Sequence, residues 1–151
     1  MSTRIDHVTI GTVDPDHFEN LLVGVFGLEK VRETREQIEQ HPVNRLFGWE
    51  DGDPIVPRTN HYGSEGSQSL IEVVHLRNAV QVRRDYTKPP QAVFHIGLAV
   101  TNLEEIMEKA RAMDLEYVSD IVDFAAPGRV FRAGFIRTFG VEFELIERPA
   151  A

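Results

Sequence analysis

Two stretches of this chain carry the same pattern, one beginning at His7 and the other at His95. In each, a histidine opens a short run of alternating apolar residues, and a turn and then apolar residues at helical spacing follow. Phe18 follows His7 at the same separation at which Ile106 follows His95. An internal repeat constrains the fold strongly, because each copy must form an equivalent unit of structure.

The two stretches also continue and end alike. Leu28–Val31 corresponds to Leu115–Val118, and the strand-like run around Glu72 corresponds to the run around Glu144. Four matching features in one order predict two modules, each with a strand, a helix and three further strands.

The first copy is the longer one, with an insertion at about residues 35–66 that is broken by proline and glycine. We therefore predict a first module over residues 1–76 and a second over residues 92–151. The polar segment 77–91, which ends in Pro-Pro, is typical of a linker.

Local signals mark the ends of the two predicted helices. Asp14 followed by Pro15 is a helix start, and Gly27 is a helix end. In the second module, Asn102 lies three residues before Glu105, which is the spacing of a capping box. The apolar stripes predicted to face the core are Phe18, Leu21, Leu22 and Val25, and then Leu103, Ile106, Met107, Ala110 and Met113.

Strand alternation places four ionisable side chains on the face that does not pack on helices: His7, Glu72, His95 and Glu144. Burying four such groups without partners would cost several kcal/mol, and a shared divalent cation removes that cost. Imidazole and carboxylate ligands suit Zn, Ni, Co, Mn or Fe(II), and the set leaves positions open for water or substrate. The sequence therefore predicts a metal site. The other histidines, His17, His41, His61 and His75, are expected in surface or loop positions, with His61–Tyr62 as a candidate cover of a substrate pocket.

Composition excludes several classes of function. The chain of 151 residues has 16 Lys and Arg against 24 Asp and Glu, and this excess of acid disfavours a nucleic-acid groove or an anionic membrane surface. It has no cysteine, which excludes disulfides, thiolate zinc sites, iron–sulfur clusters and a cysteine nucleophile. The N-terminal residues contain no apolar signal segment, so a cytoplasmic protein is expected.

The strand patterns DHVTI, SLIEVV, FHIGLAV and FELIE resemble the four ligand-bearing strands of the vicinal oxygen chelate superfamily. That superfamily includes glyoxalase I, methylmalonyl-CoA epimerase, extradiol dioxygenases and the fosfomycin and bleomycin resistance proteins. The resemblance implies an α+β fold of paired βαβββ modules, whose open, curved, mostly antiparallel sheet surrounds one metal, and it implies a homodimer. Its ligand positions correspond to His7, Glu72, His95 and Glu144, the set similar to that of glyoxalase I.

Three functions remain open at this point. The first is a metal-dependent isomerase, epimerase or lyase that transfers a proton next to a carbonyl of a small substrate, with Glu144 and Glu72 as candidate bases. The second is an Fe(II) dioxygenase of the extradiol type that uses His7, His95 and Glu144 as its triad. The third is a drug- or metabolite-binding resistance protein without catalysis.

The substrate is a small molecule of a class that the sequence leaves open. Arginine side chains are candidates to bind a carboxylate or phosphate group, and aromatic side chains are candidates to line an apolar pocket. The arginines are Arg32, Arg35, Arg45, Arg58, Arg129, Arg132 and Arg137, and the aromatic residues are Phe47, Trp49, Tyr62, Phe131 and Phe135.

Overall fold

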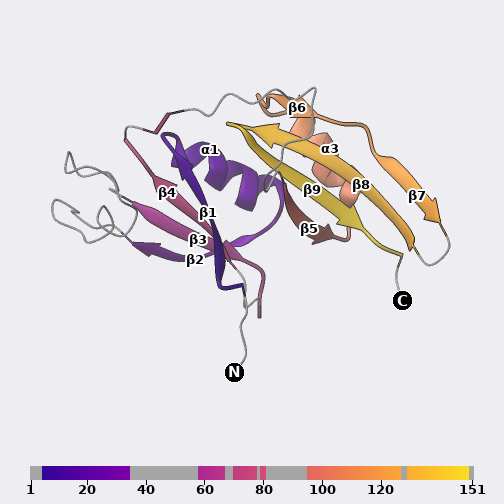
Figure 1. The fold of residues 1–151 in the computed structure, drawn as a ribbon, viewed down its shortest axis with the longest axis horizontal. Coiled ribbons are helices and arrows are strands. Elements are labelled where there is room, and N and C mark those ends of the chain that lie inside the picture. Colours follow the sequence, from indigo (N-terminus) through magenta and orange to yellow (C-terminus); the bar gives the residue numbers. More distant parts are fainter. Residues whose placement is uncertain are drawn as a thin grey trace. The chain divides into compact units, whose positions relative to one another are not determined.

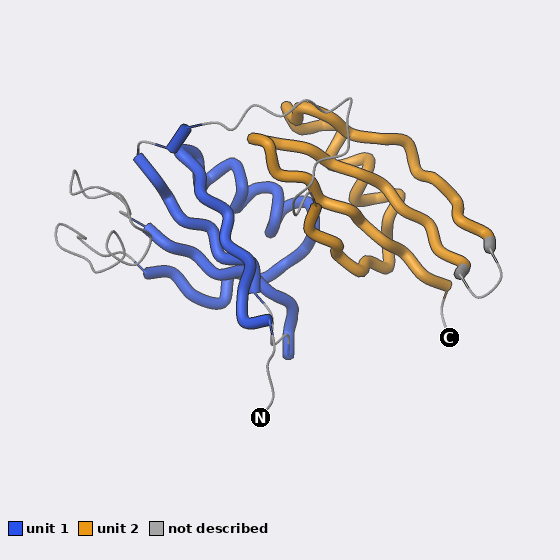
Figure 2. Tube along the Cα trace, in the orientation of Figure 1, with its two compact units in different colours: residues 1–80 blue, residues 81–151 orange. Residues whose placement is uncertain are grey.

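The computed structural model describes residues 5–34, 58–66, 70–77, 79–80, 95–126 and 129–149. The chain divides into two compact units, Met1–Val80 and Gln81–Ala151 (Figure 2). Most of the predicted insertion and of the predicted linker lies outside the described residues. No helix in the described part of the chain has the length and the apolar character needed to span a membrane.

The first unit is one mixed sheet with a helical segment (Figure 1). Its elements are β1 (His7–Thr12), α1 (Pro15–Glu19), which continues as a π-helix (Asn20–Val25), β2 (Glu29–Thr34), β3 (Thr59–Gly63) and β4 (Leu70–His75). The strand order is β1-β4-β3-β2, with β1 parallel to β4 and the other pairs antiparallel.

The second unit repeats this arrangement (Figure 1). Its elements are β5 (Ile96–Val100), α3 (Leu103–Arg111), β6 (Tyr117–Val118), β7 (Val122–Ala126), β8 (Arg129–Thr138) and β9 (Val141–Glu147). β5 is parallel to β9, β9 is antiparallel to β8, and both β6 and β7 pair with β8 in the place that β2 takes beside β3. The predicted α+β fold of two βαβββ modules is confirmed.

The first helix forms as its sequence predicts. The Asp14 carboxylate accepts a hydrogen bond from the backbone N–H of His17 at 3.0 Å, and Pro15 occupies the first turn. Gly27, with φ of 74°, ends the helical segment in the left-handed region that glycine adopts without strain. The four predicted core residues of this segment are all buried, namely Phe18, Leu21, Leu22 and Val25.

The capping box predicted for Asn102 and Glu105 at the start of the second helix is not formed. The Asn102 side chain does not cap the helix, and its amide donates to the Glu105 carboxylate at 3.4 Å instead. The N–H of Leu103 donates to Oε1 of Glu147 at 3.1 Å, so a carboxylate from β9 satisfies the helix start. The helix still buries Leu103, Ile106, Met107 and Ala110, while Met113 is half-buried.

The expectation that His61 and Tyr62 lie in irregular chain is also wrong. Both belong to β3, which pairs with β2 on one side and β4 on the other. Tyr62 is fully buried on the helix side, where its hydroxyl donates to Glu19 Oε2 at 3.1 Å and accepts from the Asn60 amide at 3.0 Å. Burial raises the pKa of Tyr62 to about 12. Tyr62 is therefore part of the core.

Candidate metal centre

In the first unit, the parallel pairing of β1 with β4 brings His7 and Glu72 together. Nε2 of His7 lies 3.7 Å from Oε2 of Glu72. Thr9 stands directly opposite Glu72 in the β1–β4 register, and its hydroxyl donates to the same Oε2 at 2.7 Å. The Glu72 carboxylate is thus anchored from the strand that carries His7.

In the second unit, the parallel pairing of β5 with β9 does the same for His95 and Glu144. Nε2 of His95, which lies one residue before β5, is 3.2 Å from Oε2 of Glu144. Gly97 stands directly opposite Glu144, in the position that Thr9 occupies opposite Glu72. In both units, therefore, the histidine lies two residues before the partner of the glutamate.

The spacing of these donor atoms fits ligation of a metal ion. Two ligand atoms that are each about 2.1 Å from a metal lie roughly 3.0–3.4 Å apart in octahedral or tetrahedral coordination, close to the separations in both pairs. The side chains are partly exposed, 43% for His7, 19% for Glu72, 30% for His95 and 22% for Glu144, so that an ion can reach them.

Each unit contributes two of the four predicted ligands. Within the part of the chain that the structure describes, no group of three or more His, Asp or Glu side chains is arranged to hold a metal by itself. The site that combines all four residues therefore stays a prediction.

His61, which the sequence predicts in a surface or loop position, is a neighbour of Glu72. It stands opposite Glu72 in the β3–β4 register, with its Nε2 3.3 Å from Oε1 of Glu72 and its ring 6.5 Å from that of His7. Burial, and next the charge of Arg32, lower the pKa of His61. Thr59–Gly63 shows no alternation of apolar and polar residues, and the prolines and glycines around it hid a strand of five residues.

The equivalent position in the second unit holds an aromatic ring. Phe135 stands opposite Glu144, and its ring lies edge-on to His95 with centroids 5.5 Å apart. This predicted pocket residue therefore contacts His95. The two His–Glu pairs consequently have different neighbours, an imidazole beside Glu72 and a phenyl ring in the corresponding place.

Three of the four predicted arginines whose side chains the structure describes have carboxylate partners. Arg58 pairs with Asp16, and Arg137 pairs with Glu142 at 2.7 Å. Arg132 pairs with Glu104 and, at 3.2 Å each, with Asp123 and Glu147. These ion pairs occupy the charges that a substrate anion would need. Arg35 and Arg45 and the side chain of Arg129 lie outside the described residues.

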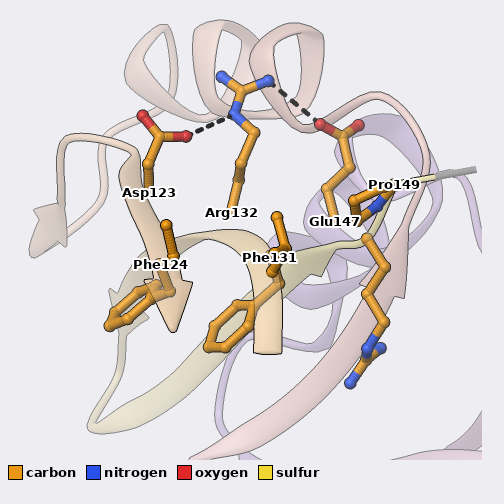
Figure 3. Close-up of a pocket in the computed structure, with 9 residues that line it drawn as sticks. Asp123, Phe124, Phe131, Arg132, Glu147 and Pro149 are labelled. Atoms are coloured by element: carbon orange, nitrogen blue, oxygen red, sulfur yellow. Dashed lines mark hydrogen bonds and ion pairs between the residues drawn. The ribbon is translucent and has the colours of Figure 1, made fainter. Parts of the chain in front are cut away.

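A cavity of about 260 Å³ opens beside β7 and β8 of the second unit (Figure 3). The rings of Phe124 and Phe131 stack along one wall, with centroids 4.6 Å apart, and Arg132 bridges two carboxylates at another. The residues that line this cavity do not include His95 or Glu144. Phe131 thus lines a pocket as predicted, but a different one. Phe47 and Trp49 lie outside the described residues.

Solved structures of other proteins share the fold of this chain. A glyoxalase family protein from Bacillus cereus superposes with a TM-score of 0.69 at 18% identity, over 97% of this chain and 95% of that one. The trypanothione-dependent glyoxalase I of Leishmania major gives 0.61 at 17% identity, over 97% of this chain and 87% of that one. This chain has the vicinal oxygen chelate fold.

Further structures with the vicinal oxygen chelate fold serve different functions. The fosfomycin resistance protein FosX of Listeria monocytogenes, crystallised with Mn(II), gives a TM-score of 0.60 at 16% identity, over 96% of this chain and 92% of that one. An antibiotic-binding protein from Streptomyces, TnmS3, gives 0.58 at 10% identity, over 97% and 96%. No family model and no curated protein sequence matches the chain. At these identities the likeness establishes the fold.

Proposed function

We propose that this protein is a divalent-metal-dependent isomerase, epimerase or lyase that transfers a proton next to a carbonyl of a small substrate. The observation that carries the proposal is the recurrence of one His–Glu pair at equivalent register in both units. One structure with this fold, the fosfomycin resistance protein FosX, contains Mn(II), which supports a metal site in this protein.

The metal would be held by His7, Glu72, His95 and Glu144. A bound divalent ion supplies Lewis-acid stabilisation of the negative charge that develops on a substrate oxygen when the neighbouring proton leaves. Imidazole and carboxylate ligands suit Zn, Ni, Co, Mn and Fe(II) alike.

We assign the proton transfer to Glu144, because the two glutamates are held differently. Glu72 is in contact with Thr9, His7 and His61. Among the described residues, His95 is the one side chain that pairs with Glu144, and the residue opposite it is a glycine with no hydroxyl to donate. A carboxylate that no hydroxyl anchors reorients at lower cost than one that accepts a 2.7 Å hydrogen bond. Glu144 would therefore take the proton at a carboxylate oxygen and return it, while Glu72 stays in place.

Elemental analysis of purified protein is the first test. We expect one divalent metal per chain in the wild type and a loss of at least half in His7→Ala and in His95→Ala. If neither substitution alters the metal content, the ion is bound elsewhere and the proposal fails.

The second test separates the roles of the glutamates. We would follow solvent deuterium exchange at the carbon next to the carbonyl by NMR for a panel of small α-hydroxy and α-thio carbonyl compounds. Glu144→Gln should keep its metal and lose exchange by at least a hundredfold, whereas Glu108→Gln, an exposed control on α3, should match the wild type. Full exchange in Glu144→Gln would rule out the base, and oxygen uptake with catechols would favour the dioxygenase instead.

A further inference from the structure

Four residues form a straight row across the first sheet. Arg32 on β2 stands opposite His61 on β3, His61 stands opposite Glu72 on β4, and Glu72 stands opposite Thr9 on β1. Residues that are directly opposite on neighbouring strands project from the same face of a sheet. The row therefore places a guanidinium group on the face that carries the candidate metal ligands.

The Arg32 side chain is held in place by His61. Its Nη2 lies 2.8 Å from Nε2 of His61, and its Nε lies 3.4 Å from Nδ1. Because an arginine only donates, Nε2 of His61 must accept this hydrogen bond. Glu72 Oε1 lies 3.3 Å from the same Nε2, so the guanidinium and the carboxylate are within about 6 Å of each other.

The rest of the guanidinium is available to a ligand. Arg32 is exposed, and no carboxylate of the described residues pairs with it, in contrast to Arg58, Arg132 and Arg137. A guanidinium has five N–H donors, and its planar fork matches the two oxygens of a carboxylate or phosphonate.

We infer that Arg32, positioned by His61, binds an anionic group of the substrate beside Glu72. This inference rests on the proposed function and names its substrate class: a small carbonyl compound with a carboxylate, phosphate or phosphonate group. Because Arg32 and Glu72 lie against one imidazole nitrogen, the anionic group is only a few bonds from the reacting carbonyl. A neutral carbonyl compound, or one with a distant charge, would leave Arg32 unused.

The test uses three hydroxamates that share one metal-chelating group. Acetohydroxamate carries no further charge, whereas malonomonohydroxamate and phosphonoacetohydroxamate each add an anion one methylene away. Their affinities for manganese-loaded protein are measured by titration calorimetry for the wild type, Arg32→Gln and Arg77→Gln, an exposed arginine of the same unit.

We expect at least one of the two anionic probes to bind the wild type about tenfold or more tightly than acetohydroxamate, which corresponds to one charge-assisted interaction. The probe with the larger gain identifies the preferred anion. Arg32→Gln should abolish the gain of the anionic probe over acetohydroxamate, while Arg77→Gln should retain it. The inference is overturned if neither anionic probe gains, or if the gain survives in Arg32→Gln.

A second arm needs no metal and therefore separates this inference from the proposed function. Metal-free protein is titrated with phosphonoacetate, and the ¹H–¹⁵N resonance of the Arg32 Nε is followed by NMR. A saturable shift supports the anion site even if the protein binds no manganese, an outcome that would count against the proposed function alone. A resonance that does not move overturns the inference.

Discussion

Removing the Thr9 hydroxyl should weaken metal binding without disturbing a proposed ligand. Thr9→Val keeps the shape and the strand propensity of the side chain but deletes the 2.7 Å hydrogen bond to Glu72 Oε2. Glu72 would then keep its contacts with His7 and His61 but lose the hydrogen bond that anchors Oε2. The carboxylate would spend more time in orientations that cannot ligate a metal.

The expected loss of metal affinity depends on how exposed the hydrogen bond between Thr9 and Glu72 is. Loss of a partner that orients a metal ligand costs roughly 10–100-fold in metal affinity. Thr9 is exposed, so water can replace part of the lost interaction, and we expect the lower end, about tenfold or 1.4 kcal/mol.

Competition with a fluorescent zinc chelator would measure the affinity, and Gly97→Thr provides the matched control. A Cβ at Gly97 would lie 3.9 Å from Cδ1 of Ile146, an ordinary contact, so the backbone leaves room for a side chain to begin there. Its hydroxyl would anchor Glu144 as Thr9 anchors Glu72, which should tighten metal binding and slow proton transfer. A change of less than twofold in Thr9→Val would refute the reasoning.

Three further predictions concern the stability of the fold. A Cβ at Gly134 would lie 2.7 Å from Sδ of the buried Met107, so Gly134→Ala should lower the free energy of unfolding, measured in urea, by about 1–3 kcal/mol. Gly24→Ala, whose Cβ would meet nothing within 4 Å, should cause no such loss. Equal losses in the two variants would exclude the packing explanation. Phe139 has φ of 48° in the β8–β9 turn, so Phe139→Asn should raise the melting temperature by relieving about 1 kcal/mol, and a decrease would show that contacts of the ring outweigh the strain. The pKa of Tyr62 is raised to about 12, and its neutral form is favoured by folding, so stability should be intact below about pH 10 and fall by about 2 kcal/mol as the pH rises towards 12. Tyr62→Phe should remove this alkaline decline, and an unchanged decline would assign it to another group.

Much of the fold could be predicted because its signals are local. Alternation marked β1 and β9, helical spacing marked the buried stripes of α3 and of α1 with its π-helical continuation, and the repeat related the two modules. The proximity of His7 to Glu72 and of His95 to Glu144 follows from the same alternation once the strands pair in parallel. A signal that extends over one strand or one helix survives folding, because backbone geometry sets its period.

The predictions were wrong where a segment distant in the sequence determines the local structure. β3 is stabilised as a strand by hydrogen bonds to β2 and β4, although prolines and glycines surround it in the sequence. The start of α3 is satisfied by Glu147, from the last strand, and not by the neighbouring Asn102. Neither partner can be recognised from residues nearby in the chain.

By itself, the sequence determined that this protein has two βαβββ modules and that each contains one His–Glu pair. Only the tertiary structure decided what surrounds each pair: Thr9 and His61 at Glu72, and Gly97 and Phe135 at Glu144. It also decided that Arg32 reaches the first pair through His61. The physical reason is register. Which residues stand opposite one another depends on how strands distant in sequence align, and a shift by one residue would turn every one of these side chains to the other face.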